Sequence, residues 1–254
     1  MIDLTGKTIL LTGASSGIGA ATAGVLGRAG ASLVAHYADD PAGAEAATAG
    51  ILPERKLLLQ ADFAERGTGR KLWQEALAWR GRIDVLVNNA AIMPETPLDA
   101  ADAEWDANWT KILQVNVVEP ANLMRDAVRH YRAEGGGIII SISSWAAQQG
   151  STIPQLTAYA STKAAIKAMT QTIARAHAKD GVLAYVIAPG IVRTRMSQIS
   201  ATTRGGEEGV RAALPLGDMV PPVEVANLVA FVSSGLCRHM TGATLDINGA
   251  AYVR

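Results

Sequence analysis

Seven short runs of apolar residues recur along the chain, bounded by glycine, aspartate or asparagine. They are rich in valine, isoleucine and leucine, and their apolar and polar positions do not alternate. Continuous apolar runs of this length are typical of strands that are covered on both faces of a parallel sheet. The predicted strands are residues 8–11, 31–35, 56–60, 85–88, 138–141, 184–188 and 244–247.

Longer alanine-rich stretches with helical spacing separate these runs. The main predicted helices are residues 17–28, 69–80, 103–132, 159–179 and 222–233. Regular alternation of strand and helix predicts the α/β class: a single-domain, Rossmann-type, doubly wound parallel sheet of about seven strands flanked by helices. No shift in composition divides the chain, so we expect residues 1–254 to form one domain.

Residues 194–222 interrupt this rhythm with Gly205, Gly206, Gly217 and three prolines. We expect a long loop there, with a short helical turn at 207–214. Loops of this length in compact domains often cover a binding site, so the segment is interpreted as a lid; a surface loop packed against a neighbouring subunit is the alternative. In a lid, the apolar side chains would face the pocket; they are Met196, Ile199 and Leu214. The charged side chains would stay in water; they are Arg204, Glu207, Glu208 and Arg211.

Composition and charge exclude several classes of partner. Lys+Arg and Asp+Glu both number 23, and the resulting net charge of +0 argues against nucleic acid or an anionic membrane surface. The single cysteine, Cys237, allows no intrachain disulfide, and the four histidines lack metal-ligand spacing, so no metal is expected. With no apolar run near the roughly 18 residues of a membrane span and no visible signal peptide, we expect a cytoplasmic protein.

A glycine-rich turn directly follows the first predicted strand. Its glycines, Gly13, Gly17 and Gly19, have GxxxGxG spacing, and Ser15, Ser16 and Ile18 lie between them. Glycines permit a tight turn and close approach of the backbone, and a helix that begins at residue 17 directs free N–H groups at a phosphate. We therefore predict a pyrophosphate-binding loop; an ordinary strand–helix turn is the alternative.

The end of the second strand bears on the choice between NAD and NADP. An acid there favours the free 2′-hydroxyl of NAD. His36 and Tyr37 occupy this place, and Asp39 comes slightly too late. Since His36 and the hydroxyls of the glycine-rich turn are able to bind a 2′-phosphate weakly, the sequence slightly favours NADP over NAD.

Two groups of residues suggest acid–base chemistry. Tyr159 and Lys163 stand at i and i+4, which puts a phenol and an ammonium on one helical face, about 6 Å apart at Cβ. A nearby cation favours the phenolate and lowers the pKa of the tyrosine, so that it can exchange a proton with an alcohol. Ser143 and Ser144 end the fifth strand, at the edge where ligands of open α/β sheets bind. Alone, each pattern also fits a solvated helix face or a cap.

Taken together, these pieces resemble the short-chain dehydrogenase/reductase family over nearly the whole chain. The matching motifs, in order, are Thr12-Gly13-xxx-Gly17-x-Gly19, Asp62, Asn88-Asn89-Ala90, Asn116, Ser143-Ser144, Tyr159-xxx-Lys163, Pro189-Gly190-xxx-Thr194 and Thr241-Gly242. The resemblance implies one dinucleotide-binding and catalytic domain that oxidises an alcohol or reduces a carbonyl with NAD(P), and whose usual assembly is a homotetramer.

The resemblance also implies individual roles. Tyr159 is the expected acid/base, Lys163 tunes it and holds the nicotinamide ribose, and Ser144 polarises the carbonyl. Other expected cofactor contacts are Asp62 to the adenine, Asn89 and Ala90 to the adenosine ribose, and Pro189, Gly190, Val192 and Thr194 to the carboxamide.

Asn116 permits a check from the residues themselves. Pro120 lies four positions later and has no N–H to donate to the carbonyl of Asn116, which predicts a kink and a free C=O. The family places there a water that connects Lys163 to solvent; a proline tolerated as a structural kink is the alternative.

The substrate remains open between sugars, polyols, other secondary alcohols, steroids and 3-oxoacyl groups on a carrier protein. Arg125, Arg129 and Arg132 offer a basic patch for an acidic carrier, or a solvated helix face, and Asp180 argues against the carrier. The loop between Ser144 and Tyr159 is two residues longer than usual for the family. A non-catalytic NAD(P)-binding sensor is the rival function, which the intact Ser144, Tyr159 and Lys163 disfavour.

Overall fold

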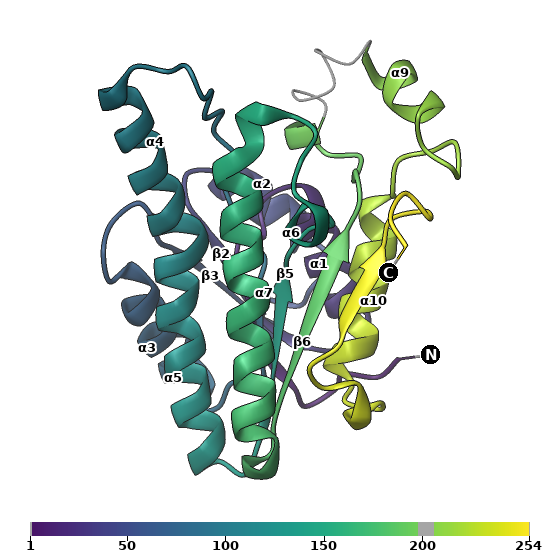
Figure 1. The fold of residues 1–254 in the computed structure, drawn as a ribbon. Coiled ribbons are helices and arrows are strands. Elements are labelled where there is room, and N and C mark those ends of the chain that lie inside the picture. Colours follow the sequence, from purple (N-terminus) through teal and green to yellow (C-terminus); the bar gives the residue numbers. More distant parts are fainter. Residues whose placement is uncertain (1, 198–205, 254) are drawn as a thin grey trace.

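The centre of the molecule is a seven-stranded sheet in which every strand is parallel to its neighbours (Figure 1). The computed structural model describes residues 2–197 and 206–253. The strand order is β3-β2-β1-β4-β5-β6-β7, as expected for a doubly wound sheet. The strands are β1 (Thr8–Leu11), β2 (Ser32–Tyr37), β3 (Lys56–Gln60), β4 (Val85–Asn88), β5 (Gly137–Ile142), β6 (Val182–Pro189) and β7 (Thr244–Ile247).

Helices cover both faces of this sheet, which explains why its strands are apolar on both sides. Along β1, Ile9 and Leu11 belong to one hydrophobic core and Leu10 to the other. The first core is covered by α1 (Gly17–Arg28) and α10 (Pro222–Ser233), and the second by α3 (Thr68–Arg80), α5 (Glu119–Ala133) and α7 (Thr157–His177). The seven predicted strands and the α/β class are confirmed.

The predicted helix 103–132 is interrupted near its middle. It consists of α4 (Asp102–Leu113), a π-helical turn (Gln114–Val118) and α5. The N–H of Glu119 donates to the carbonyl of Gln114, five residues back, and Pro120 lies in the first turn of α5. The sequence predicted a kink and a free carbonyl at Asn116; the structure shows a π turn that contains this residue, and such turns are frequent at functional sites.

Shorter helices complete the chain. They are α2 (Pro41–Ala47), α6 (Ala146–Gln149), α9 (Gly206–Ala212), and 3₁₀ turns at Pro53–Arg55, Pro154–Leu156, Ala178–Asp180 and Arg238–Met240. The pattern of the sequence had not indicated α2 or α6, whereas α9 overlaps the turn predicted at 207–214. Within the described ranges, no helix combines the length and the hydrophobicity required to cross a bilayer.

Candidate active site

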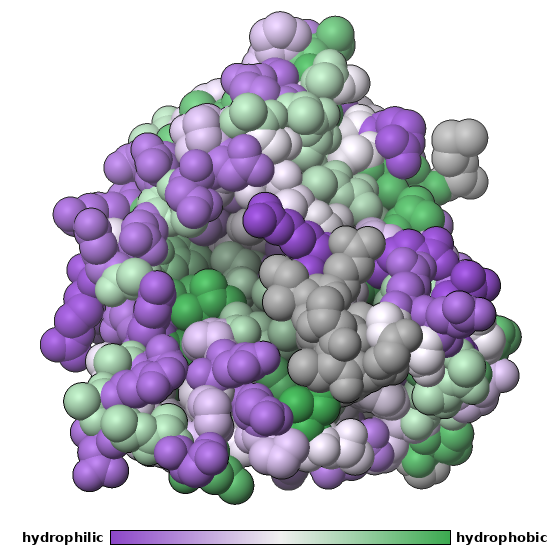
Figure 2. Space-filling model, turned by 90° about the horizontal axis from the view of Figure 1, so that it is seen from above, coloured by the Kyte–Doolittle hydropathy of each residue, from purple (hydrophilic) through white to green (hydrophobic). Residues whose placement is uncertain are grey.

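A cavity of about 1230 Å³ runs along the carboxyl ends of the strands. Its lining includes the glycine-rich turn after β1, the ends of β2 to β6, one side of α7, and residues of α9. Figure 2 looks onto this end of the molecule and shows a hollow with apolar side chains on its wall and hydrophilic ones around it. The topology therefore gathers motifs that are far apart in the sequence into one site.

The turn after β1 is a backbone cradle. Gly13 has a φ of 68°, and a Cβ on it would lie 2.9 Å from Cα of Ala90; a Cβ on Gly19 would lie 1.8 Å from the carbonyl oxygen of Gly13. Ser16 precedes α1, and its side chain makes no capping hydrogen bond, so it leaves the first N–H groups of the helix available to an anion. All six predicted loop residues line the cavity: Gly13, Ser15, Ser16, Gly17, Ile18 and Gly19. The cradle fits the pyrophosphate of a dinucleotide.

Thr12 and Asn89 brace this cradle from the next strand. The hydroxyl of Thr12 accepts hydrogen bonds from the N–H groups of Asn89 (2.9 Å) and Ala90 (3.0 Å). The side-chain amide of Asn89 donates to the carbonyls of Thr12 (2.9 Å) and Gly13 (3.0 Å). Asn89 and Ala90 both line the cavity. The sequence predicts no bracing role for Thr12, which appears there only as part of a motif, because its hydrogen-bond partners lie about 77 positions away.

His36 lines the cavity, but its surroundings do not support the expected weak binding of a 2′-phosphate. Its ring is 2% exposed and stacks on Phe63 with centroids 4.5 Å apart. Nδ1 accepts from the N–H of Gly13 (3.1 Å), and Nε2 lies 2.8 Å from the carbonyl of Ala61, to which it donates as the neutral tautomer. Burial lowers the pKa of His36 to about 4. The ring is therefore a neutral support for the cradle.

The other residues predicted near the adenosine divide into two groups. Asp62 lines the cavity, and its Oδ1 accepts a hydrogen bond from the N–H of Ala64 at 2.8 Å. Tyr37, by contrast, ends β2 half-buried and is not among the described residues that line the cavity. The expectation that Tyr37 contacts the cofactor is therefore not supported by the geometry.

Ser144, Tyr159 and Lys163 meet at the other end of the cavity. The hydroxyl of Ser144 lies near the phenol of Tyr159 and acts to lower the pKa of that phenol. The ammonium of Lys163 lies 5.6 Å from the centre of the Tyr159 ring and donates to the carbonyl of Ile142 at 2.9 Å. Ser143 has a different task, since its hydroxyl donates to the main-chain carbonyl of Lys163 (2.8 Å) and so ties β5 to α7.

Burial dominates the protonation of this cluster. It raises the pKa of Tyr159 to about 12, although the Ser144 hydroxyl acts in the opposite direction. It lowers the pKa of Lys163 to about 8. The sequence predicted that Lys163 would lower the pKa of the phenol; here the opposite shift prevails, because the protein surrounding the half-buried phenol disfavours its charged form. At neutral pH the phenol carries its proton.

Asn116 joins the π turn to α7. It is 2% exposed; its side-chain amide donates to the carbonyl of Ile92 (2.9 Å) and the hydroxyl of Thr162 (3.2 Å), and its side-chain oxygen accepts from the N–H of Ile92 (2.9 Å). Thr162 follows Tyr159 within α7, so Asn116 fixes the helix that carries the phenol. That the main-chain carbonyl of Asn116 supports a water stays a prediction.

The turn after β6 closes the site. The N–H of Trp145 donates to the carbonyl of Pro189 (2.9 Å), and a Cβ on Gly190 would lie 2.8 Å from Cβ of Asn248, so only glycine fits there without a shift. Val192 pairs with Val220 as an isolated β-bridge. The four residues predicted to contact a carboxamide, Pro189, Gly190, Val192 and Thr194, line the cavity.

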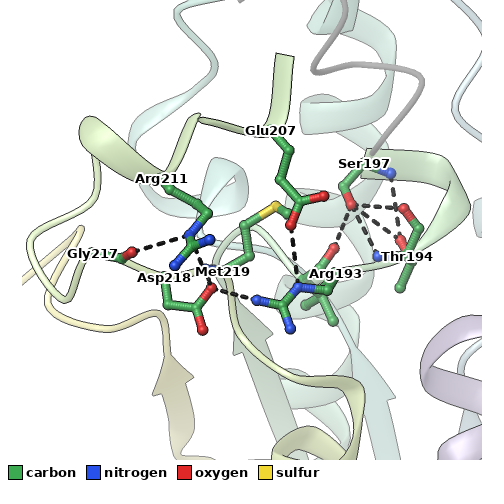
Figure 3. Close-up of polar contacts among 9 residues, drawn as sticks. Arg193, Thr194, Ser197, Glu207, Arg211, Gly217, Asp218 and Met219 are labelled. Carbon is green, nitrogen blue, oxygen red and sulfur yellow. Dashed lines mark hydrogen bonds and ion pairs between the residues drawn. The ribbon is translucent and has the colours of Figure 1, made fainter. Parts of the chain in front are cut away.

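The segment predicted as a lid lies beside this turn. Met196 and Leu214 line the cavity, as expected, while Glu207, Glu208 and Arg211 are exposed. Ile199 and Arg204 lie outside the described residues. In Figure 3 the guanidinium of Arg193 contacts Glu207 of α9 (3.4 Å) and Asp218. That the segment moves over a substrate stays a prediction.

Comparison with known proteins places this geometry in context. The family model described as enoyl-(acyl carrier protein) reductase matches residues 13–250. The chain is 30% identical to L-rhamnose 1-dehydrogenase (NAD(P)(+)) of Sphingomonas over 98% of both chains, and 30% identical to 3-oxoacyl-[acyl-carrier-protein] reductase of Escherichia coli over 99% of this chain and 100% of that protein. It is 32% identical to cis-4-hydroxycyclohexanecarboxylate dehydrogenase of Sinomonas cyclohexanicum over 96% of this chain and 95% of that protein.

Solved structures agree with these relatives. A 3-oxoacyl (acyl-carrier-protein) reductase of Agrobacterium tumefaciens, solved with NADP bound, superposes with a TM-score of 0.86 at 31% identity, over 98% of this chain and 95% of that one. A glucose/ribitol dehydrogenase of Brucella melitensis gives 0.88 at 28% identity, over 100% and 99%.

Proposed function

The chain belongs to the short-chain dehydrogenase/reductase family of NAD(P)-dependent oxidoreductases, and we propose that it interconverts an alcohol and a carbonyl compound at the cluster of Ser144, Tyr159 and Lys163. The observation that carries this proposal is the position of the Tyr159 phenol: it lies near the Ser144 hydroxyl and the Lys163 ammonium, in the same cavity as the backbone cradle. The bound nicotinamide would supply or accept the hydride.

The protein's own residues handle the proton. In the direction of reduction, Tyr159 would donate its proton to the carbonyl oxygen as the carbonyl carbon receives the hydride. Ser144 would hydrogen-bond the same oxygen and stabilise the negative charge that develops there. Lys163 would hold the phenolate that remains, and solvent would return the proton. A phenol that is protonated at neutral pH is ready for this direction.

We infer that the cofactor is NAD rather than NADP, against the slight preference in the sequence. That preference relied partly on His36, which is neutral and bonded through both nitrogens. The described lining at the ends of β2 and β3 holds two carboxylates, Asp39 and Asp62, and no cation. A 2′-phosphate would meet negative charge there, whereas a ribose hydroxyl can donate to it. The relatives named above include one solved with NADP and one named for both cofactors, so this choice rests on the lining alone.

Replacement of Tyr159 by phenylalanine tests the function. Tyr159→Phe removes the proton donor and keeps the ring, so turnover of the best substrate from an alcohol and carbonyl panel should fall by at least roughly 10²-fold while the dissociation constant of NADH changes little. Tyr185→Phe is the matched control, because its hydroxyl lies 3.4 Å from the carbonyl of Cys237, away from the cavity lining.

Titration of the parent protein with NADH and with NADPH, monitored by nicotinamide fluorescence, tests the choice of cofactor. NADH should bind about tenfold more tightly than NADPH. Turnover of Tyr159→Phe within a factor of about two of the parent would overturn the catalytic assignment, and tighter binding of NADPH would overturn the choice of NAD. Intact binding of NADH without turnover of any compound by the parent would instead favour a sensor.

A further inference from the structure

We propose that the substrate is a small organic anion, an alcohol or ketone whose apolar body carries a carboxylate that Arg195 and Lys111 recognise. This rests on the oxidoreductase function proposed for the same site. The observation behind it is how charge is distributed along the cavity. Among the described lining residues, both carboxylates, Asp39 and Asp62, belong to the cofactor end.

The rest of the cavity has the opposite charge. Apart from the ends of β2 and β3, its described lining contains three cations, Lys111, Lys163 and Arg195, and no aspartate or glutamate. Lys163 is already used, since its ammonium donates to Ile142 and lies close to the phenol. Lys111 and Arg195 are exposed in the wall and remain to attract an anion, because a cleft lined by one sign of charge concentrates ligands of the other.

No ion pair among the described residues accounts for the presence of either cation at the cavity. Within residues 2–197 and 206–253, neither forms an ion pair. Lys111 has no acid three or four positions away in its helix; its neighbours at these spacings are Ala107, Asn108, Gln114 and Val115. Arg193 provides the contrast, since its guanidinium is paired with Glu207 and Asp218 (Figure 3).

Local structure holds Arg195 at the cavity. The hydroxyl of Thr194 accepts from the N–H of Ser197 (3.4 Å), while the N–H of Thr194 donates to the hydroxyl of Ser197 (3.0 Å), and both contacts are visible in Figure 3. This reciprocal pair is a capping box, which fixes the start of a helical turn. Arg195 is the first residue after Thr194, so it stands beside the turn predicted to contact the nicotinamide.

The remaining wall suits an apolar body. The side chains that line this end include Met93, Trp145, Leu156, Met196, Val210 and Leu214. An apolar wall with a few polar groups is typical of small-molecule sites, in which the polar groups fix the orientation. Because Lys111 and Arg195 belong to the cavity lining, the anion they attract must enter the cavity. The arginines that the sequence offers to a carrier protein belong to α5 instead, and there Arg132 is already paired with Asp180 at 3.1 Å.

Matched pairs of acids and amides test the proposal. We would measure NADH-dependent reduction of three ketones with aliphatic, cyclohexyl and aryl bodies, each as the free carboxylate and as the uncharged carboxamide; 4-oxocyclohexanecarboxylate is the cyclohexyl acid. For at least one of the three ketones, kcat/KM should be at least tenfold higher for the carboxylate than for the carboxamide. Arg195→Gln and Lys111→Gln should each reduce this ratio by about threefold to fivefold, through KM, and the double variant should bring it close to one. The ratio should also fall with added salt.

Two further measurements separate this proposal from others. Lys71→Gln, at an exposed lysine of α3 outside the cavity lining, should leave the ratio unchanged. Binding of the corresponding hydroxy acids and hydroxy amides to the NADH-loaded protein, followed by tryptophan fluorescence, tests the preference even if nothing is turned over, which would itself contradict only the proposed function.

The proposal is overturned if amides bind as well as acids for every body. It is also overturned if Arg195→Gln weakens NADH binding and leaves the acid–amide ratio intact, or if a carrier-bound 3-oxoacyl thioester exceeds every free acid in kcat/KM.

Discussion

Lys163, which we propose to hold the phenolate during the reaction, destabilises the empty protein. Its side chain is 5% exposed, and burial lowers its pKa from 10.5 to about 8. Below pH 8 both the folded and the unfolded chain carry the proton, so the folded state bears the full cost of a buried charge. Between about pH 8 and 10.5 the unfolded chain binds more protons, and stability therefore rises with pH. The full cost is about 3 kcal/mol, at roughly 1.4 kcal/mol for each pH unit.

Lys163→Met should therefore be more stable than the parent at pH 7 while losing turnover and cofactor affinity. The gain should approach the cost given above, less about 1 kcal/mol for the lost hydrogen bond to Ile142, and should disappear toward pH 10.5. Urea unfolding of both proteins at several pH values between 7 and 10 measures this difference, in which the titration of Tyr159 largely cancels. A variant that is less stable at every pH would contradict the account.

At the scale of single residues, the sequence identified groups whose chemistry depends on local spacing. Tyr159 and Lys163 follow from the i, i+4 rule, and the glycines follow from the turn. His36 was misjudged because its partners, Gly13, Ala61 and Phe63, come from other elements. Its charge depends on burial, which no local pattern reveals.

At the scale of elements, Glu119 connects two helices that are distant in the sequence. It is 0% exposed, and its carboxylate accepts from the N–H groups of Gly67 and Gly69 (2.8 Å each), from Gln114 (2.7 Å) and from Asn122 (3.3 Å). Glu119 thus caps the start of α3 from the first residue of α5, at a helix whose own N-cap is a glycine. The carboxylate is compensated by N–H donors and by the helix dipole.

Loss of this cap should be costly. Glu119→Ala leaves buried donors unpaired and should lower the free energy of unfolding by about 3 kcal/mol; Glu119→Gln keeps the shape but replaces one acceptor by a donor, and should cost about half as much. Chemical denaturation measures both changes. The control is Glu75→Gln, at an exposed glutamate of α3. Equal stability of Glu119→Ala and the parent would show that the contacts contribute nothing.

The lid prediction also belongs to this scale. Met196, Val210 and Leu214 line the cavity, so a bound substrate should shield this segment from water. Amide hydrogens across residues 194–222 should exchange rapidly in the empty protein and slowly with NADH and a substrate analogue together. Peptides of α10 serve as the internal reference. Slow exchange that ligands do not change would make the segment a fixed surface element.

Long, regular elements could be predicted from the sequence, and short ones could not. The seven strands follow from apolar runs, and a kink near Asn116, where the structure has a π turn, was predicted because Pro120 cannot donate a hydrogen bond. Helices α2 and α6, with 7 and 4 residues, are too short to show a helical period and depend on their tertiary surroundings. The cap formed by Glu119 has no signature at all, since its partners lie about 50 residues away.

The whole molecule presents one outer face suited to self-association. Helices α4, α5 and α7 form its outer layer in Figure 1. Several exposed or half-buried positions of α7 carry small or apolar side chains, namely Ala164, Ala165, Ala168 and Met169. Leu113 and Val118 add exposed apolar side chains at the π turn, each 39% exposed. Small side chains let helices of two subunits approach closely, and repetition of a symmetric pair gives a closed assembly.

We therefore expect a homotetramer built from two dimers. Light scattering at micromolar concentration should give about four times the subunit mass of 26.5 kDa. Ala168→Glu places a charge on an exposed position of α7 and should reduce the mass to that of smaller species, because a buried unpaired carboxylate opposes association. Ala49→Glu, at an exposed position outside this layer, should leave the mass unchanged. A mass of one subunit for the parent protein would refute the assembly, and a tetramer that survives Ala168→Glu would place the interface on another face.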